Sequence, residues 1–430
     1  MQKQKIRIGL AGFGTVGTGL VQILEHNKDW IFQRMGKELE ISSILVRDLD
    51  KVRTSLPGPG TRLTSNYQDL VQDQDLDIVV ELIGGLDTAY ELIKGALESG
   101  KSVVTANKAL LAEKGPELFE LAAKNNLGLY YEASVAGGIP IVQTLKESLA
   151  GNRIKSLTAI LNGTANYILS EMTQKGLSFS QALGQAQEMG YAEADPALDV
   201  DGLDAAHKLT VLVRIAYGQD YPLQDLPVQG IRDIQPFDIS RAWGFGYRIK
   251  LIAQVKEKSG QLQAGIFPAL LPAEHMLAKV EGPFNAILLE GNAVGPVMLY
   301  GQGAGDLPTG SAVLADIMTL VNRTAYYNNT GFLNSSLPRA AILDPQLTVC
   351  KHYFRFTVQD RPGVLSILSG IMGDRNISIA QVVQKQEANG KFVPVVFLTH
   401  SAQMQDVQSA LQEIERLDFI KAPVAHFRIL

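Results

Sequence analysis

The glycine-rich turn near the amino terminus constrains the fold of this chain more than any other segment. Residues 6–11 predict a short buried strand, Gly12-Phe13-Gly14-Thr15-Val16-Gly17 follows it, and a helical pattern continues to about residue 34. Between a strand and a helix, the first glycine permits a tight turn, the second lets backbone approach a pyrophosphate, and the third lets the helix pack on the strand. The segment therefore predicts a dinucleotide site with its phosphates on the helix amides. The alternative is a packing turn without a ligand.

Three further apolar, β-branched runs at residues 39–46, 77–83 and 102–106 alternate with helix-like segments. Such alternation is typical of a parallel sheet covered by helices, so we expect an α/β fold with a Rossmann-type, doubly wound sheet. Thr105 lies near the end of the last of these runs and Lys108 follows it, at the carboxyl edge where such sheets bind ligands. For Lys108 the alternative is a solvated lysine at a helix start.

The residues after the run at 39–46 bear on the choice of cofactor. Arg47 is placed to neutralise the 2′-phosphate of NADP, with Lys51 and Arg53 as helpers. Asp48 would instead suit the ribose hydroxyl of NAD. We favour NADP and keep NAD as the alternative.

Length and composition narrow the class of protein. A chain of 430 residues exceeds what one core usually supports, so we expect two or three domains. A net charge of −5 without a long basic run gives no reason to expect nucleic acid or an anionic membrane as partner. The sequence lacks a signal peptide pattern and any apolar run near about 18 residues, which predicts a cytoplasmic location. The single cysteine, Cys350, excludes an internal disulfide, and the histidines lack the spacing of a structural zinc site.

The acidic segment at residues 190–208 is the strongest candidate for chemistry, because it holds five carboxylates and one lysine. Residues 204–217 predict a helix on which Asp204 and Lys208 share a face. That face continues into Val211 and Ile215, so we expect the pair at a buried or cleft-facing helix start. The alternative is an exposed salt bridge without a chemical role.

Seven positions of this segment carry a resemblance to a known family, in order and spacing: Glu193, Asp195, Pro196, Asp199, Gly202, Asp204 and Lys208. They resemble the substrate-site signature of the homoserine dehydrogenases, and the resemblance extends along nearly the whole chain. It implies the reversible, NAD(P)H-dependent reduction of L-aspartate 4-semialdehyde to L-homoserine, in threonine, methionine and isoleucine biosynthesis. Aspartate-semialdehyde dehydrogenase is disfavoured because it needs a cysteine nucleophile, and Cys350 lies far from both glycine-rich turns. Another amino-acid dehydrogenase, or a nonenzymatic regulator that binds NADP and an amino acid, stays as the alternative.

The resemblance, with the chemistry of the side chains, suggests roles for these residues. Lys208 is the expected proton donor to the forming alkoxide, since a lysine is charged at neutral pH, and Lys108 beside the nicotinamide can share or replace that role. Glu193 is expected to bind the substrate ammonium and Asp204 its amino or hydroxyl group, whereas Asp199 orders the loop and the lysine.

Four further residues are candidates because they lie at helix starts or glycine turns. Thr164 is either a ligand of the substrate carboxylate or a plain N-cap. Gly190 is expected to approach the cofactor. Gly303 and Gly305 open a second glycine-rich helix start, and the resemblance implies that this segment returns to the nucleotide domain and touches the cofactor.

A strand at residues 127–132 runs into a glycine-rich loop. From the residues alone, a plain glycine turn is the simpler interpretation. The resemblance implies a sodium ion held by Glu132 and the carbonyls of Val135, Gly137 and Ile139.

Residues 350–430 predict the order strand, helix, strand, strand, helix, strand of a ferredoxin-like module. The module resembles the ACT domains, which bind amino acids, and the residues expected to contact an effector are Asp360, Gly363, Asn376 and Ile377. The resemblance implies L-threonine as the effector. A module used only for assembly is the alternative.

The predicted domains are residues 1–135, an NADP-binding Rossmann domain completed by a helix at 307–322, and 136–306, an α+β domain for substrate binding and dimerisation. A linker at 323–349 and the ACT domain at 350–430 follow. Strand-like stretches in the second domain predict an open sheet, which this family uses to form a dimer or tetramer.

Overall fold

The computed structural model describes residues 5–51, 60–322, 329–384, 391–421 and 423–430. The chain divides into two compact units. The first unit comprises Met1–Leu157, Asp204–Leu226 and Phe284–Ala340, and the second comprises Thr158–Leu203, Pro227–Pro283 and Ala341–Leu430. Neither unit is a single stretch of sequence.

The first unit is built on a six-stranded parallel sheet in the order β3-β2-β1-β4-β5-β6. The strands are β1 (Lys5–Ala11), β2 (Glu38–Leu45), β3 (Arg62–Thr64), β4 (Ile78–Glu81), β5 (Ser102–Thr105) and β6 (Leu129–Tyr130). The chain reverses its direction of winding between β1 and β4, which creates the ligand crevice of a doubly wound sheet. The predicted α/β fold class is confirmed.

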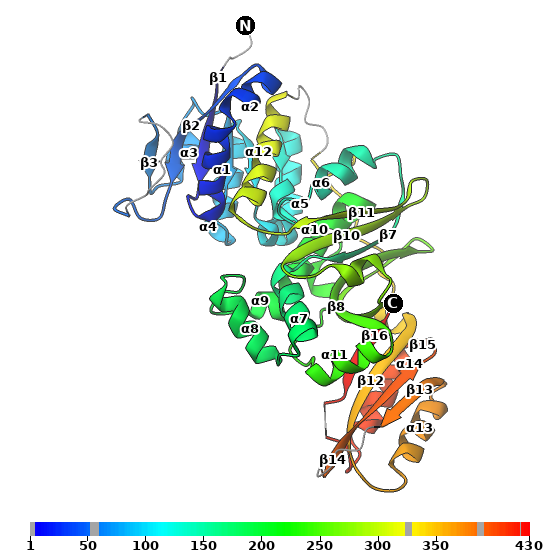
Figure 1. Ribbon diagram of the computed structural model, residues 1–430. Coiled ribbons are helices and arrows are strands. Elements are labelled where there is room, and N and C mark those ends of the chain that lie inside the picture. The colour runs from blue at the N-terminus through cyan, green and yellow to red at the C-terminus, as the bar shows by residue number, and fades with distance from the viewer. Residues whose placement is uncertain (1–4, 52–59, 323–328, 385–390, 422) are drawn as a thin grey trace. The chain divides into compact units, whose positions relative to one another are not determined.

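Helices accompany this sheet in the first unit, and two of them come from far along the chain. They are α1 (Thr15–His26), α2 (Lys28–Met35), α3 (Gln68–Gln72), α4 (Asp87–Glu98), α5 (Lys108–Lys124), α10 (Leu203–Tyr217) and α12 (Asp306–Asn322). Helix α12 lies beside α1 (Figure 1), and its Val313, Ile317 and Leu320 enter the core of β1 and β2. The helical pattern expected to residue 34 is two helices, because Asn27 leaves helical geometry and ends α1.

The first unit also contains an antiparallel hairpin and short helical turns. The hairpin joins β10 (Phe284–Gly291) to β11 (Gly295–Gln302). The turns are a 3-10 helix at Glu132–Ser134, α6 (Ile141–Gln143) and a π-helical segment at Thr144–Ser148. Strand β7 (Ile154–Ile160) is divided between the two units.

The second unit contains strands in the order β8-β9-β16-β12-β14-β13. They are β8 (Tyr247–Lys258), β9 (Gln261–Pro272), β12 (Val349–Gln359), β13 (Ile379–Gln384), β14 (Phe392–Thr399) and β16 (Ala425–Ile429), with β15 (Ala402–Gln403) paired to β12. The helices are α7 (Gly163–Lys175), α8 (Phe179–Glu188), α9 (Ala197–Val200), α11 (Pro236–Gly244), α13 (Val364–Asp374) and α14 (Met404–Ile414). Strand β16 pairs parallel with β9, so the carboxyl-terminal module continues the sheet of β8 and β9.

The carboxyl-terminal module has the predicted βαββαβ order, with β12, α13, β13, β14, α14 and β16. Phe354, Phe356 and Val358 of β12 pack into one buried cluster with α13 and α14. Because side chains alternate across a strand, Arg355 and Thr357 lie on the other face of this sheet. Among the described residues, no helix is long and apolar enough to span a bilayer.

Candidate active site

Asp204 lies between two lysine ammonium groups in the first unit. It occupies the first turn of α10, and Lys208 lies one turn later on the same face. Lys208 Nζ donates to Asp204 Oδ2 at 2.8 Å, and Lys108 Nζ lies 2.9 Å from Asp204 Oδ1. The Asp204 and Lys208 side chains are 8% and 10% exposed, whereas that of Lys108 is 39% exposed. The predicted burial of the helix start is therefore found, and Lys108 reaches it from the start of α5.

The cluster carries two cations and one anion. Burial alone would raise the pKa of Asp204, but Lys208 and Lys108 more than offset it and hold that pKa below its ordinary value of 3.8. Asp204 is therefore ionised at neutral pH and stabilises both ammonium groups. Burial lowers the pKa of the neighbouring His207, so His207 adds no cation at neutral pH.

The glycine-rich turn has the geometry that a pyrophosphate requires. Gly12 has a φ of +102°, and a Cβ there would lie 2.6 Å from the Leu82 carbonyl oxygen. A Cβ on Gly17 would lie 2.4 Å from the Gly12 carbonyl oxygen, so the helix approaches the strand closely. At Gly14 a Cβ would meet nothing within 4 Å, which leaves this glycine open at the start of α1. Two glycines thus serve packing and the middle one faces open space, as a nucleotide site needs.

A cavity of about 210 Å³ lies against this turn. Gly14, Thr15, Val16 and Gly17 line it together with Glu81 at the end of β4 and residues that follow β4 and β5, which are Leu82, Gly84, Ala106 and Asn107. It is therefore at the carboxyl edge of the parallel sheet, where ligands of doubly wound folds bind. The residues at this edge of the sheet therefore fit a bound dinucleotide.

Glu81 is a residue of this cavity that the sequence patterns did not single out. Its Oε1 accepts the amides of Ile83 and Gly84 at 2.9 and 3.0 Å, and its Oε2 accepts the Thr105 hydroxyl at 2.5 Å. Thr105 in turn accepts the Asn107 amide at 3.0 Å. Burial raises the pKa of Glu81. The sequence signal that could have identified Glu81 is a carboxylate at the end of a buried strand. Through these hydrogen bonds Glu81 joins the loops after β4 and β5.

Two other predicted cofactor residues, Arg47 and Thr105, do not line this cavity. Arg47 is exposed just beyond β2. Arg53, a proposed helper, lies outside the described residues. Thr105 is buried, and its hydroxyl is bonded to Glu81. Its observed contacts order the turn before Lys108.

Comparisons with known proteins agree with this geometry along the whole chain. The family model "Homoserine dehydrogenase, NAD binding domain" matches residues 12–132, "Homoserine dehydrogenase" matches 140–318, and "ACT domain" matches 352–418. A homoserine dehydrogenase of Neisseria gonorrhoeae is 39% identical over 99% of this chain and 98% of its own length. A crystal structure of a homoserine dehydrogenase from Thiobacillus denitrificans is 40% identical with a TM-score of 0.93, covering 100% of this chain and 99% of that chain.

This chain belongs to the homoserine dehydrogenase family. It is accordingly an NAD(P)-dependent oxidoreductase that acts on a CH-OH group, with a carboxyl-terminal ACT domain. The resemblance stated from the sequence is confirmed. The solved structure of a hyperthermophilic archaeal homoserine dehydrogenase in complex with NADPH is 31% identical, with a TM-score of 0.64, and covers 75% of this chain and 99% of that chain.

Two predicted substrate residues of the second unit, Asp199 and Thr164, lie around the start of α7. Asn162 caps α7, and its Nδ2 donates to Asp199 Oδ1 at 2.6 Å. The Thr164 hydroxyl donates to the Tyr191 carbonyl at 2.6 Å, so the N-cap is Asn162 rather than Thr164. Glu193 is exposed. Asp199 and Thr164 thus hold the acidic loop to α7.

Gly190, Gly303 and Gly305 also have structural contacts. The Gly190 amide donates to the Gln187 carbonyl at 3.1 Å, at the end of α8. A Cβ on Gly303 would lie 2.2 Å from the Asn285 side chain, so Gly303 is required for packing. The Gly305 carbonyl accepts the Thr309 amide at 3.3 Å at the start of α12. Their predicted cofactor contacts stay predictions.

Glu132 lies in a buried acidic environment in the first unit. Its two carboxylate oxygens accept the amides of Val142 and Gln143 at 2.8 and 2.7 Å, and its own amide donates to Asp316 at 2.7 Å. Burial raises the pKa of Glu132 to about 7. Burial and the charge of Glu132 raise the pKa of Asp316 well above its ordinary value. Lys146 lowers both pKa values without offsetting burial, so a bound cation would stabilise the ionised carboxylates further.

The loop after Glu132 supplies the other predicted metal ligands. Val135 and Ile139 are buried, and the Ile139 carbonyl accepts the Ile141 amide at 2.8 Å. A Cβ on Gly137 would lie 2.6 Å from the Gly303 carbonyl oxygen. Among the described residues, no group of three histidine, cysteine or acidic side chains is placed to hold a metal ion. A site here would depend on backbone carbonyls beside Glu132.

The predicted effector residues lie around α13. Gly363 precedes α13 with a φ of +89°, and a Cβ there would meet nothing within 4 Å. Asp360 is exposed just after β12, and Ile377 is buried. Asn376, with a φ of +57°, ends the turn after α13. The space beside the Gly363 Cα, at the start of α13, is open.

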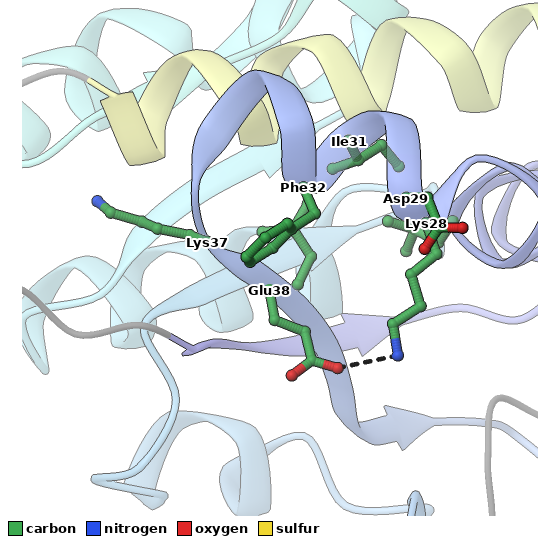
Figure 2. A pocket seen from close by; sticks show the side chains of 8 residues that line it. Lys28, Asp29, Ile31, Phe32, Lys37 and Glu38 are labelled. Atoms are coloured by element: carbon green, nitrogen blue, oxygen red, sulfur yellow. Dashed lines mark ion pairs between the residues drawn. The ribbon is translucent and has the colours of Figure 1, made fainter.

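A further cavity of about 260 Å³ in the first unit is not the nucleotide site. Figure 2 shows Phe32 and the Lys28–Glu38 ion pair, 3.0 Å long, among the side chains that line it. Lys37 and Glu38 lie at the start of β2. The glycine-rich turn follows the end of β1, so the two cavities are at opposite edges of the parallel sheet.

Proposed function

We propose that Lys208 delivers the proton in the reversible reduction of L-aspartate 4-semialdehyde to L-homoserine. The observation that supports this is the buried Asp204 carboxylate, which holds Lys208 at 2.8 Å and Lys108 at 2.9 Å. NAD(P)H supplies the hydride to the aldehyde carbon. Lys208 Nζ gives a proton to the aldehyde oxygen and is reprotonated from solvent, and in homoserine oxidation it accepts that proton instead.

Asp204 and Lys108 have complementary tasks in this proposal. Asp204 keeps Lys208 charged and oriented, and it also binds the amino or hydroxyl group of the substrate. Lys108 adds a second positive charge that favours a developing oxyanion. Glu193 binds the substrate ammonium, Asp199 orders its loop, and Thr164 supports the substrate carboxylate at the start of α7.

The activity is tested by following NADPH absorbance during L-homoserine oxidation and semialdehyde reduction. The wild-type chain should turn over in both directions, and Lys208→Ala should lose turnover with little loss of NADPH affinity. Full turnover of Lys208→Ala would remove this residue as donor. NADPH binding without any turnover by the wild-type chain would favour the nonenzymatic alternative.

NADP is the proposed cofactor. The support is the position of Arg47 just beyond β2, together with the NADPH complex of the archaeal relative. Arg47→Ala should weaken NADPH binding much more than NADH binding, because only NADPH carries the 2′-phosphate. Equal weakening of both would contradict a phosphate-binding role.

A sodium ion is proposed beside Glu132, with the carbonyls of Val135, Gly137 and Ile139. Since the pKa of Glu132 is raised to about 7, its ionisation lowers the free energy of unfolding as pH rises from 4.5 to 7. A bound cation offsets that loss. Sodium chloride should therefore raise the melting temperature more at pH 8 than at pH 5, relative to choline chloride. Equal shifts at both values would contradict the site.

Regulation by L-threonine through the ACT domain is proposed from the open helix start at Gly363. Amides at such a start can bind a carboxylate. L-threonine should inhibit homoserine oxidation, and no change at saturating L-threonine would contradict this role.

A cytoplasmic location and a place in threonine, methionine and isoleucine biosynthesis stay predictions.

A dimer or tetramer is proposed from the hairpin of β10 and β11. Tyr300 and Val294 are 56% and 46% exposed there, beside the half-buried Val297, Met298 and Leu299 of β11, and contiguous exposed apolar side chains can mark a subunit interface. Light scattering should give a mass at least twice that of one chain. A single-chain mass at micromolar concentration would contradict an oligomer.

A further inference from the structure

A polar cavity of about 420 Å³ lies in the second unit, on the face of the ACT sheet away from α13 and α14. Arg355 and Thr357 of β12 line it, and they alternate with Phe354, Phe356 and Val358, which pack under those helices. The start of α13 at Gly363 does not line it. The cavity is therefore distinct from the effector position proposed above.

The side chains of the cavity provide partners for both charges of an amino acid. Arg355 and Lys421 are cationic, Asp233 is anionic, and Thr357 and Gln235 offer neutral hydrogen-bonding groups. The Arg355 side chain is only 8% exposed, and its Nε donates to the buried Asp238 at 2.7 Å, which fixes the guanidinium. A held guanidinium of this kind loses little entropy when it binds a carboxylate.

Residues 229–235, several of which line the cavity, are bonded to the acidic segment at residues 190–208. The Ile231 amide donates to the Val200 carbonyl of α9 at 2.8 Å. A Cβ on Gly230 would lie 2.3 Å from that same carbonyl oxygen. Arg232, which lines the cavity, forms two hydrogen bonds with Asp201, the residue that follows α9. A ligand in the cavity thus contacts a segment packed directly on the helix that carries Asp199.

We infer that this cavity binds a free α-amino acid and so joins the ACT domain to the substrate loop. The carboxylate pairs with Arg355 and Lys421, the ammonium pairs with Asp233, and a side-chain hydroxyl bonds to Thr357 or Gln235. The inference extends the proposed amino-acid regulation by giving it a second location. The bound amino acid restrains residues 229–235. Through Arg232 it also restrains Asp201.

The test uses the full-length protein and L-threonine, with acetate and ethylamine as probes that carry one charge each. Isothermal titration calorimetry should show L-threonine binding more tightly than either probe. Lys421→Glu should weaken L-threonine at least tenfold, whereas Lys351→Glu, an exposed change elsewhere on β12, should alter it less than twofold. Equal affinities of the two variants would overturn the inference.

Hydrogen–deuterium exchange locates the ligand without any substitution. L-threonine should protect the backbone amides of residues 229–235 and 423–427. Protection confined to residues 360–377, or no binding of L-threonine, would overturn the inference. Homoserine oxidation without L-threonine should be unchanged in Lys421→Glu, so the proposed enzymatic function is tested separately.

Discussion

Helices α7 and α10 each carry a carboxylate followed four residues later by a lysine, and the two pairs lie in different environments. Glu171 and Lys175 on α7 are 2.5 Å apart, and the Lys175 side chain is 56% exposed. Asp204 and Lys208 on α10 are 2.8 Å apart, and both side chains are at most 10% exposed. The Glu171 side chain is itself only 10% exposed, so the same spacing gives a pair with its lysine in solvent on α7 and a pair with both partners buried on α10.

The difference shows that spacing alone does not identify a catalytic pair. Burying a charge is costly unless it is paired, so α10 keeps Asp204 and Lys208 only because each compensates the other. Lys108 then adds a third charge at 2.9 Å, which leaves the α10 cluster with excess positive charge. An excess positive charge in a low-dielectric site suits proton donation and oxyanion stabilisation, whereas the exposed Lys175 charge is screened by solvent.

The largest expected contrast is in turnover. Lys208→Ala should lower kcat for homoserine oxidation by about 10³-fold, because the proton donor is lost. Lys175→Ala, the matched change on α7, should leave kcat unchanged. Steady-state kinetics at saturating NADP measures both, and similar kcat values for the two variants would remove the distinction between the pairs.

The second contrast is in stability. Asp204→Asn should lower the free energy of unfolding by about 3 kcal/mol, because it leaves the buried Lys208 without its anion. Glu171→Gln should have a much smaller effect, since Lys175 remains in solvent. Urea denaturation of the wild type and both variants gives the values, and a larger loss in Glu171→Gln would contradict the account.

Lys108 should have an intermediate effect on activity. Lys108→Gln should lower kcat by roughly tenfold, because a half-exposed charge 2.9 Å from Asp204 is more screened than the buried Lys208. The NADPH dissociation constant separates this from loss of cofactor binding. A loss of kcat larger than that of Lys208→Ala would make Lys108 the donor.

The smallest expected effect is a pH dependence. The pKa of Asp204 is held below 3.8 in the folded protein, so its contribution to stability is present above that value and is lost only as pH falls through the lower folded value. The difference in unfolding free energy between wild type and Asp204→Asn should stay constant from pH 7 to about pH 4. A decline that begins near pH 6 would contradict ionised Asp204.

Much of the fold could be predicted from the sequence, because its signals are local. The turn from residue 12 to residue 17, the parallel order of the first sheet and the βαββαβ module all follow from short patterns. The pairing of β16 with β9 could not be predicted, because no local pattern specifies which strands meet. The buried Asn329, which bonds to Leu127 and Leu129, lies in a stretch whose polarity predicted a linker.

The residues of the candidate site likewise include some that local spacing predicts and others that only tertiary packing brings together. Asp204 and Lys208 were predictable because they are one helical turn apart. The arrival of Lys108 at Asp204 depends on tertiary packing across 96 residues of sequence, from 108 to 204. Glu81 was missed for the same reason, since its partner Thr105 lies on the neighbouring strand. Whether Glu193 and Asp199 bind homoserine stays a prediction.

The central claim is that a buried ammonium on α10 moves the proton, and chemical rescue tests it most directly. Methylamine added to Lys208→Ala should restore homoserine oxidation in proportion to its concentration, and it should not change the rate of Lys175→Ala. A Lys208→Ala rate that does not respond to methylamine, while Lys108→Ala responds, would contradict the assignment and place the donor on α5.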